Sequence, residues 1–220
     1  FVINRVNVKA TESELANINT YLQPTANCQV NDPTIVALAQ RLTAGLSTPT
    51  QKASAILDYV IDNIAYAGYY DTTRGAKKTL TDKRGNCCDQ AHLVIALFRA
   101  ADLPARYVHG TCTFSSGPIG HVWAQVLIDG TWVVADPVSS RNSLGVVNNW
   151  NINTFTNISY NNYVGYLALD NNSNSQKNIT RTSQINEQLR TSYRNDWLEV
   201  MLDGSLNYTH SRNLLQSESN

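Results

Sequence analysis

The segment "HVWAQVLIDGTWVVADP", residues 121–137, restricts the fold more than any other part of the chain. Its side chains alternate strongly in polarity, and Asp129-Gly130 at its centre favours a two-residue turn between antiparallel strands. With that turn, Trp123 lies opposite Asp136, and His121 lies diagonally next to Asp136 on the same face, within roughly 7–8 Å. The segment therefore predicts a hairpin that brings an imidazole and a carboxylate together.

A second segment, "RGNCCDQAHLVIALFRAADLPARYVHG", predicts a helix that begins at a pair of cysteines. Apolar residues recur at three-and-four spacing from Cys88 until the chain reaches Leu103-Pro104. Cys87 falls in the first turn, where unpaired N–H groups and the helix dipole favour thiolate over thiol. Because neighbouring residues on a helix diverge by about 100°, Cys87 and Cys88 are not expected to face one site, and His92 is expected to project elsewhere.

Both segments also have an interpretation without catalysis. The two cysteines can be buried as small apolar residues, which is common for free cysteines. His121 can be a histidine at a strand edge, and Asp136 a turn residue before Pro137. The shared face of His121 and Asp136 favours chemistry, since a carboxylate that fixes an imidazole next to a thiol forms the usual arrangement for nucleophilic catalysis by cysteine.

The cysteine content argues against a disulfide scaffold and against a metal site. Four cysteines in 220 residues are too few for a disulfide-rich fold, although a Cys28–Cys112 bridge stays open. The residues that could bind zinc are Cys87, Cys88, His92, His109, Cys112 and His121. No CxxC or HxxxH pair occurs among them, so their spacing disfavours metal binding.

Three segments near the N-terminus are predicted to be scaffold helices. Residues 11–23 begin with a capping box formed by Thr11 and Glu14. The next helix is predicted to start at Asp32-Pro33 and to stop at Gly45, and a third amphipathic helix follows a Thr-Pro start signal near residue 50.

The C-terminal part of the chain differs in composition. From about residue 170 the sequence is polar and indicates a linker, followed by an amphipathic segment at about 184–202. We therefore expect a domain at 1–169 and an appendage of unassigned role at 170–220.

Charge and composition exclude several functional classes. Charged residues make up 15% of the chain and the formal net charge is zero, which disfavours a nucleic-acid groove or a basic membrane-binding face. The sequence has neither an N-terminal signal-like segment nor an apolar run of the roughly 18–20 residues needed to cross a bilayer. Its polarity comes from Asn, Thr, Ser and Gln, which suits an extracellular or cell-wall substrate. We expect a monomer.

The motif G-x-C-x-D-x-A, the segment "LPARYVHG" and the hairpin together resemble the transglutaminase-like, papain-related cysteine superfamily over roughly residues 50–140. Cysteine, histidine and aspartate occur in this chain order in that superfamily. The resemblance implies an α+β fold, with the catalytic cysteine at the N-terminus of a helix packed on an antiparallel sheet that provides the other two residues. It assigns Cys87 as nucleophile, with His121 and Asp136 as its partners, and leaves Cys88 at a variable position. The Cys87 N–H is one expected oxyanion donor, and a polar side chain within 63–70 is the other.

A narrower resemblance concerns "RGNCCDQAHLV" and "GTCTFSSGPIGHVW", which look like the pseudomurein endoisopeptidases of methanogen viruses and proviruses. It implies hydrolysis of an isopeptide bond to a lysine side chain in the archaeal cell wall, outside the host membrane, with pseudomurein peptide stems as the partner. No cofactor is expected for the chemistry. The sequence does not decide whether a divalent ion such as Ca²⁺ binds, or whether wall-binding repeats precede Phe1. The alternatives on the same fold are a non-catalytic wall-binding module and a transglutaminase-type cross-linking enzyme.

Overall fold

The computed structural model describes residues 1–69, 72 and 74–161. The helices are α1 (Glu12–Ala16), the 3₁₀ helix η1 (Ile18–Leu22), α2 (Pro33–Thr43), α3 (Pro49–Asn63), α4 (Gly75–Asp82) and α5 (Cys87–Ala100). The strands are β1 (Val8–Lys9), β2 (Ala65–Tyr66), β3 (Arg84–Gly85), β4 (Ala105–Phe114), β5 (Gly117–Ile128), β6 (Thr131–Ala135) and β7 (Asn151–Asn161). The predicted boundary at 169/170, the linker and the segment 184–202 lie outside the described residues.

A five-stranded antiparallel sheet forms one layer of the fold, with strand order β1-β6-β5-β4-β7. Strands β5 and β6 pair Ala124 with Ala135 and Ile128 with Thr131, so the predicted two-residue hairpin and its register are confirmed. Asp129 and Gly130 both have positive φ, as this tight turn requires. Strands β4 and β7 were not anticipated, and β4 pairs with β5 along its whole length.

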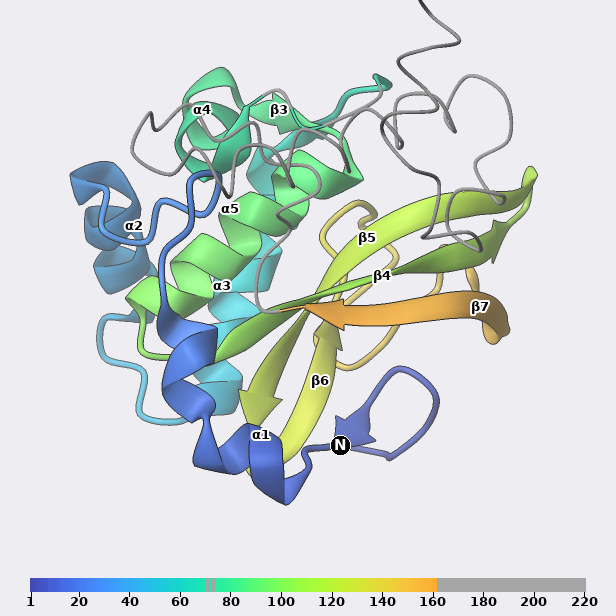
Figure 1. The fold of residues 1–220 in the computed structure, drawn as a ribbon. Helices are drawn as coiled ribbons and strands as arrows, with labels where there is room; N and C mark the ends of the chain where they lie inside the picture. The colour runs from blue at the N-terminus through green and yellow to red at the C-terminus, as the bar shows by residue number, and fades with distance from the viewer. Residues whose placement is uncertain (70–71, 73, 162–220) are drawn as a thin grey trace, which may run out of the picture. The chain divides into compact units, whose positions relative to one another are not determined.

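Helices α2, α3 and α4 lie around α5, beside the curled sheet (Figure 1). The predicted α+β class is therefore confirmed, with Cys87 as the first residue of α5. This helix is buried on all sides from Cys87 to Arg99, whereas the apolar periodicity suggested one buried face only. Its buried polar side chains are bonded: the Arg99 guanidinium donates to the Ala105 carbonyl at 2.8 Å, and His92 Nδ1 contacts the Tyr107 hydroxyl at 2.8 Å.

The two faces of the sheet contact different parts of the chain. Tyr107 on β4 points to α5, and its neighbour Val108 points to the opposite face, as the alternation of a strand requires. A second apolar cluster fills that opposite face. Its buried members are Val6, Val108, Cys112, Trp123, Val134, Val147, Trp150 and Phe155. The chain after β6 thus returns to cover the sheet beside the hairpin.

The N-terminal helices largely follow their predicted caps. The Thr11–Glu14 capping box is present, and Asp32 caps α2 with Pro33 at the first position and Gly45 in the left-handed region after the helix end. The first helix is shorter than predicted, because α1 ends at Ala16 and continues only as η1.

The segment at 81–85, just before the Cys87 helix, contains the end of helix α4 and strand β3. The open Cys28–Cys112 disulfide does not form, since all four cysteines are free and buried. No helix in the described ranges is long and apolar enough to cross a membrane.

Burial of two histidines predicts a fold that weakens in mild acid. Desolvation lowers the pKa of both His92 and His109 to about 4. An unfolded histidine titrates near 6.5, so between pH 6.5 and pH 4 the unfolded chain binds protons that the folded chain does not accept. The free energy of unfolding should therefore fall through this window as the pH falls, by up to about 3 kcal/mol for each histidine.

Urea unfolding at pH 7, 6 and 5 measures this effect. The variant His92→Gln should be less stable at pH 7, because its contacts with Tyr107 and Thr72 are altered, yet it should lose stability less steeply on acidification. An unfolding free energy that stays constant from pH 7 to pH 5 in the unmodified protein would contradict the assignment.

Candidate active site

Cys87 is positioned by the start of helix α5. Asn86 caps the helix, with its side-chain oxygen accepting the Asp89 N–H at 3.0 Å. Cys87 is therefore the first helical residue, where the N–H groups of the first turn have no carbonyl partner within the helix. The residue is 9% exposed and lines a cleft, so it is mostly shielded from bulk water.

A hydrogen-bonded hub at Asp89 fixes the chain in front of this helix. The fully buried carboxylate accepts N–H groups from Gly75 at 3.0 Å and Arg74 at 3.2 Å, together with the hydroxyl of Tyr69. Gly85 lies so close that an added Cβ would come within 3.0 Å of the Asp89 Cβ. The glycine and aspartate of the G-x-C-x-D motif thus hold the segment before Cys87 against the helix.

Cys88 lies closer to Cys87 than its helical position predicted. The two sulfur atoms are 4.0 Å apart, whereas the sequence argument expected the side chains to face different regions. The reason is that the 100° divergence applies to the directions of the Cα–Cβ bonds, and two adjacent sulfur atoms can still rotate toward each other. His92, in contrast, projects away as predicted, toward Tyr107.

His121 and Asp136 are in direct contact. Nε2 of His121 lies 2.9 Å from Oδ2 of Asp136, and the two side chains are almost completely buried. The same carboxylate oxygen accepts the indole N–H of Trp150 at 2.8 Å, and Oδ1 accepts the Val138 N–H at 3.3 Å. The aspartate is therefore held by the strand end, the following turn and a tryptophan that is close to β7.

Aromatic rings enclose the imidazole. His121 stacks on Trp123 with ring centroids 5.8 Å apart, and Phe114 meets it edge-on at 5.4 Å. Trp150 closes a third side at 6.2 Å. These contacts leave the ring little freedom to rotate, so Nε2 stays on Asp136 and Nδ1 is left for another partner.

The electrostatics of the site favour a thiolate next to an imidazolium. The pKa of the Cys87 thiol lies well below its usual value, first because of a hydrogen bond with Cys88. Desolvation alone would raise this pKa, but the hydrogen bond and the charge of His121 also lower it. Burial disfavours the charged imidazole, but Asp136 and Cys87 together raise the pKa of His121 to about 10. By contrast, burial raises the pKa of Cys28 and of Cys112. A negative sulfur at Cys87 is the state a nucleophile requires.

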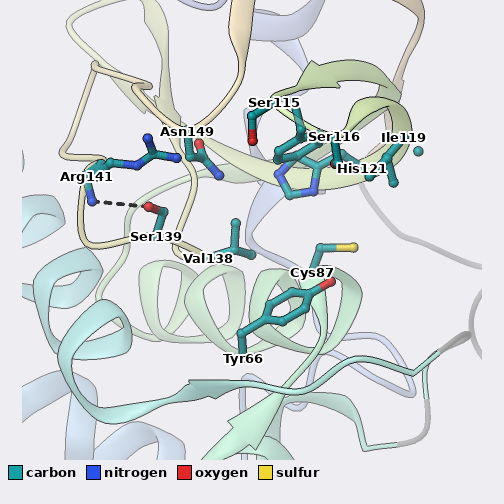
Figure 2. Close-up of a pocket in the computed structure, with 12 residues that line it drawn as sticks. Tyr66, Cys87, Ser115, Ser116, Ile119, His121, Val138, Ser139, Arg141 and Asn149 are labelled. Carbon is teal, nitrogen blue, oxygen red and sulfur yellow. Dashed lines mark hydrogen bonds between the residues drawn. The ribbon is translucent and has the colours of Figure 1, made fainter.

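A cleft of about 340 Å³ contains the reactive groups. Cys87 and His121 line it from helix α5 and strand β5 (Figure 2). The remaining lining residues are Tyr66, Phe114, Ser115, Ser116, Ile119, Gly120, Val138, Ser139, Arg141 and Asn149. Tyr66 projects from β2 toward Cys87, within the 63–70 stretch where a side-chain donor was expected.

The structure thus brings the three predicted site residues into one region, and their catalytic roles stay a prediction. Sequence reasoning missed Trp150, Arg141 and Asn149, which lie in or close to the loop after β6 and have no motif that marks them. Among the described residues, no group of three or more His, Cys, Asp or Glu side chains could hold a metal ion.

Known proteins provide an independent comparison. Residues 36–137 match the transglutaminase-like superfamily. The chain is similar to the crystal structure of a putative cysteine protease from Cytophaga hutchinsonii, with 26% identity and a TM-score of 0.52, and the match covers 70% of this chain and 58% of that protein. It is also similar to the periplasmic domain of TgpA from Pseudomonas aeruginosa, with 20% identity, a TM-score of 0.45, and coverage of 56% of this chain and 47% of that one.

None of the curated proteins compared with the chain is similar enough to count as a relative. The match over residues 36–137 agrees with the mixed helical and curled antiparallel architecture and with the cysteine at the start of a buried helix. Residues 36–137 therefore lie in a transglutaminase-like fold.

Proposed function

We propose that the protein is a cysteine-dependent hydrolase of amide bonds, in which Cys87 is the nucleophile and His121, oriented by Asp136, transfers protons. The observation that supports this most strongly is that Cys87 and His121 line one cleft, with His121 held by Asp136 at 2.9 Å. The lowered pKa of the thiol and the raised pKa of the imidazole agree with this arrangement. The superfamily fold supports a cysteine protease or a transglutaminase-type activity. The similar protein from Cytophaga hutchinsonii is named as a putative cysteine protease, which favours hydrolysis.

The mechanism begins with attack of the Cys87 thiolate on the carbonyl carbon of an amide. The resulting oxyanion would accept hydrogen bonds from the Cys87 N–H and from the hydroxyl of Tyr66. Desolvation and the nearby Cys87 raise the pKa of Tyr66 to about 12, so its hydroxyl stays protonated and can donate. His121 then gives its proton to the leaving amine, and the C–N bond breaks to leave a thioester. A water molecule that His121 deprotonates hydrolyses the thioester and restores the thiolate.

We further propose an isopeptide bond to lysine in pseudomurein as the substrate, cleaved outside the host membrane. Support for this comes from the sequence resemblance of the Cys87 and His121 segments to pseudomurein endoisopeptidases. The test is incubation with purified wall polymer, followed by identification of the new chain ends. Release of free lysine ε-amines with matching new carboxyl groups is the expected result.

Two alternatives give different outcomes in the same assay. A transglutaminase-type enzyme would incorporate an added primary amine into the polymer, since the acceptor of the acyl group decides the reaction. A non-catalytic wall-binding module would bind the polymer and release nothing, and its Cys87 would react with electrophiles no faster than an ordinary thiol.

The first prediction separates the two adjacent cysteines. Cys87→Ala should abolish turnover, because it removes the covalent route, while Cys88→Ser should retain most of it. Turnover of a model isopeptide, with folding checked by circular dichroism, measures both variants. Full activity in Cys87→Ala would exclude the proposed mechanism.

The second prediction concerns the protonation of Cys87. Because its pKa is lowered, alkylation by iodoacetamide should stay fast at pH 6, below the value of about 8.5 for a free thiol. In Cys88→Ala the profile should move to higher pH, since the first stabilising hydrogen bond is lost, and His121→Ala should move it in the same direction. Cys88→Ser retains a donor and serves as the matched control.

Peptide mapping from pH 5 to 9 assigns the alkylated residue. Cys112 and Cys28 should react slowly throughout, because they are buried and their pKa values are raised. Preferential labelling of Cys88 at low pH would move the nucleophile by one residue.

A third prediction tests the orientation of the imidazole. Asp136→Asn should fold yet lose turnover by about 10²- to 10⁴-fold, as in other sites where a carboxylate fixes a histidine. Trp150→Phe removes the indole N–H bond to Asp136 and part of the ring that packs on His121, but it keeps the carboxylate, so it should cost much less, about tenfold or below. Equal activity of Asp136→Asn and the unmodified protein would show that His121 works without the carboxylate.

A further inference from the structure

We propose that Arg5 and Asn7, here called the N-terminal clamp, are positioning residues of the active site that act through Trp150 to hold the carboxylate of Asp136 in place. Neither clamp residue lines the cleft, and both lie outside the range 36–137 that matches the superfamily. The inference rests on the proposed function, because it gives these two distant residues a role in that reaction.

Trp150 connects the clamp to the chemistry. Its indole N–H donates to Asp136 Oδ2 at 2.8 Å, and the same oxygen lies 2.9 Å from His121 Nε2. Its ring centroid also lies 6.2 Å from that of the imidazole. A displacement of Trp150 would therefore change both the direction of the carboxylate and the wall beside the imidazole.

The chain that follows Trp150 has little regular strand pairing. The register of β7 with β4 shifts between Asn151 and Thr156, so residues 152–155 are opposite Cys112 alone. Backbone carbonyls in such a stretch need donors from elsewhere, because the ladder of hydrogen bonds is interrupted.

Arg5 supplies donors to this irregular stretch. Its guanidinium donates to the carbonyl of Phe155 at 2.8 Å and to the carbonyl of Asn153. It also lies over the Phe155 ring, 4.4 Å from the centroid. That ring packs edge-on against Trp150, with centroids 5.6 Å apart. Arg5 therefore fixes both the backbone after Trp150 and a side chain that packs on it.

Asn7 holds the chain on the other side of Trp150. Its buried amide accepts the Val134 N–H at 2.9 Å and donates to the Gly145 carbonyl at 2.9 Å. The Gly145 N–H in turn donates to the Val134 carbonyl at 2.9 Å. Val134 is two residues before Asp136, so the Asn7 side chain joins the end of β6 to the loop that leads to Trp150.

The clamp is itself anchored to the sheet. Asn4 Oδ1 accepts the N–H groups of Val6 and Asn7 at 2.9 and 2.8 Å. The Val6 carbonyl accepts the Gln125 side chain at 2.7 Å. Strand β1 follows directly and pairs with β6 (Figure 1). Because the segment is fixed to the sheet at these points, it can hold Trp150 rather than move with it.

The test measures the coupling between Arg5 and Trp150 in turnover of a model isopeptide. Arg5→Ala should lower kcat about threefold to tenfold and leave KM unchanged, because the cleft surface stays intact. In a Trp150→Phe background the same change should cost almost nothing, since the bond through which Arg5 acts is already lost, whereas a purely structural effect would be equal in both backgrounds. Arg5→Lys should restore part of kcat. Lys9→Ala, which removes an exposed cation from strand β1 of the same segment, should leave kcat unchanged.

Hydrogen exchange of the Trp150 indole N–H, followed by nitrogen-15 NMR, tests the clamp without any substrate. Exchange should be faster in Arg5→Ala and in folded Asn7→Ala than in the unmodified protein, and unchanged in Lys9→Ala. Arg5 is exposed, so its variant should fold and decide the test even where Asn7→Ala does not fold.

The two measurements separate this inference from the proposed function. If indole exchange quickens in Arg5→Ala but the unmodified protein cleaves no amide, the proposed function fails and the clamp stands. If the protein cleaves amides, yet Arg5→Ala leaves kcat and indole exchange unchanged or costs the same in both backgrounds, the inference is overturned and the proposed function stands.

Discussion

The contact between His121 and Asp136 is the interaction on which the rest of the site depends. The carboxylate of Asp136 is fully buried, which is costly unless its oxygens are bonded, and here Oδ2 accepts from both His121 and Trp150 while Oδ1 accepts from Val138. The negative charge is thereby retained inside the fold. It raises the pKa of His121, and the charged imidazole in turn lowers the pKa of Cys87. Each charge of the site is stabilised by the next.

Helix α5 supplies the other half of this arrangement by being buried along nearly its whole length. A buried helix cannot slide or rotate without breaking the bonds of Asp89, His92 and Arg99, so the position of its first residue is fixed relative to the sheet. The same burial makes the helix depend on neutral His92. The burial that fixes the active site therefore also makes the folded domain less stable in mild acid.

Local sequence signals predicted the parts of the fold that local interactions determine. The Asp129-Gly130 turn set the hairpin register, and with it the approach of His121 to Asp136, because side-chain alternation propagates from a tight turn along both strands. The helix caps at Thr11 and Asp32 were likewise predicted from the sequence and are present in the structure. The start of α5 at Cys87 followed from the change of periodicity at that point.

The missed features all depend on contacts between distant segments. The loop after β6 brings Arg141 and Asn149 to the cleft and leads to Trp150 beside Asp136, and no periodicity in that polar stretch indicates its path. The approach of the Cys88 sulfur to Cys87 depends on side-chain rotation, which helical geometry alone does not determine. Burial of Asp89 and His92 likewise required knowledge of what packs around α5.

The proposed chemistry depends on Cys87 and His121 forming a thiolate–imidazolium pair in the resting protein. Nitrogen-15 NMR of the imidazole ring of His121 measures its protonation directly, without any substrate. This ring is expected to stay protonated through pH 8 and to titrate near its raised pKa of about 10, and the pKa should fall when Cys87 is replaced by Ala. A His121 ring that is already neutral at pH 7.5 and titrates near 6.5, with or without Cys87, would contradict it.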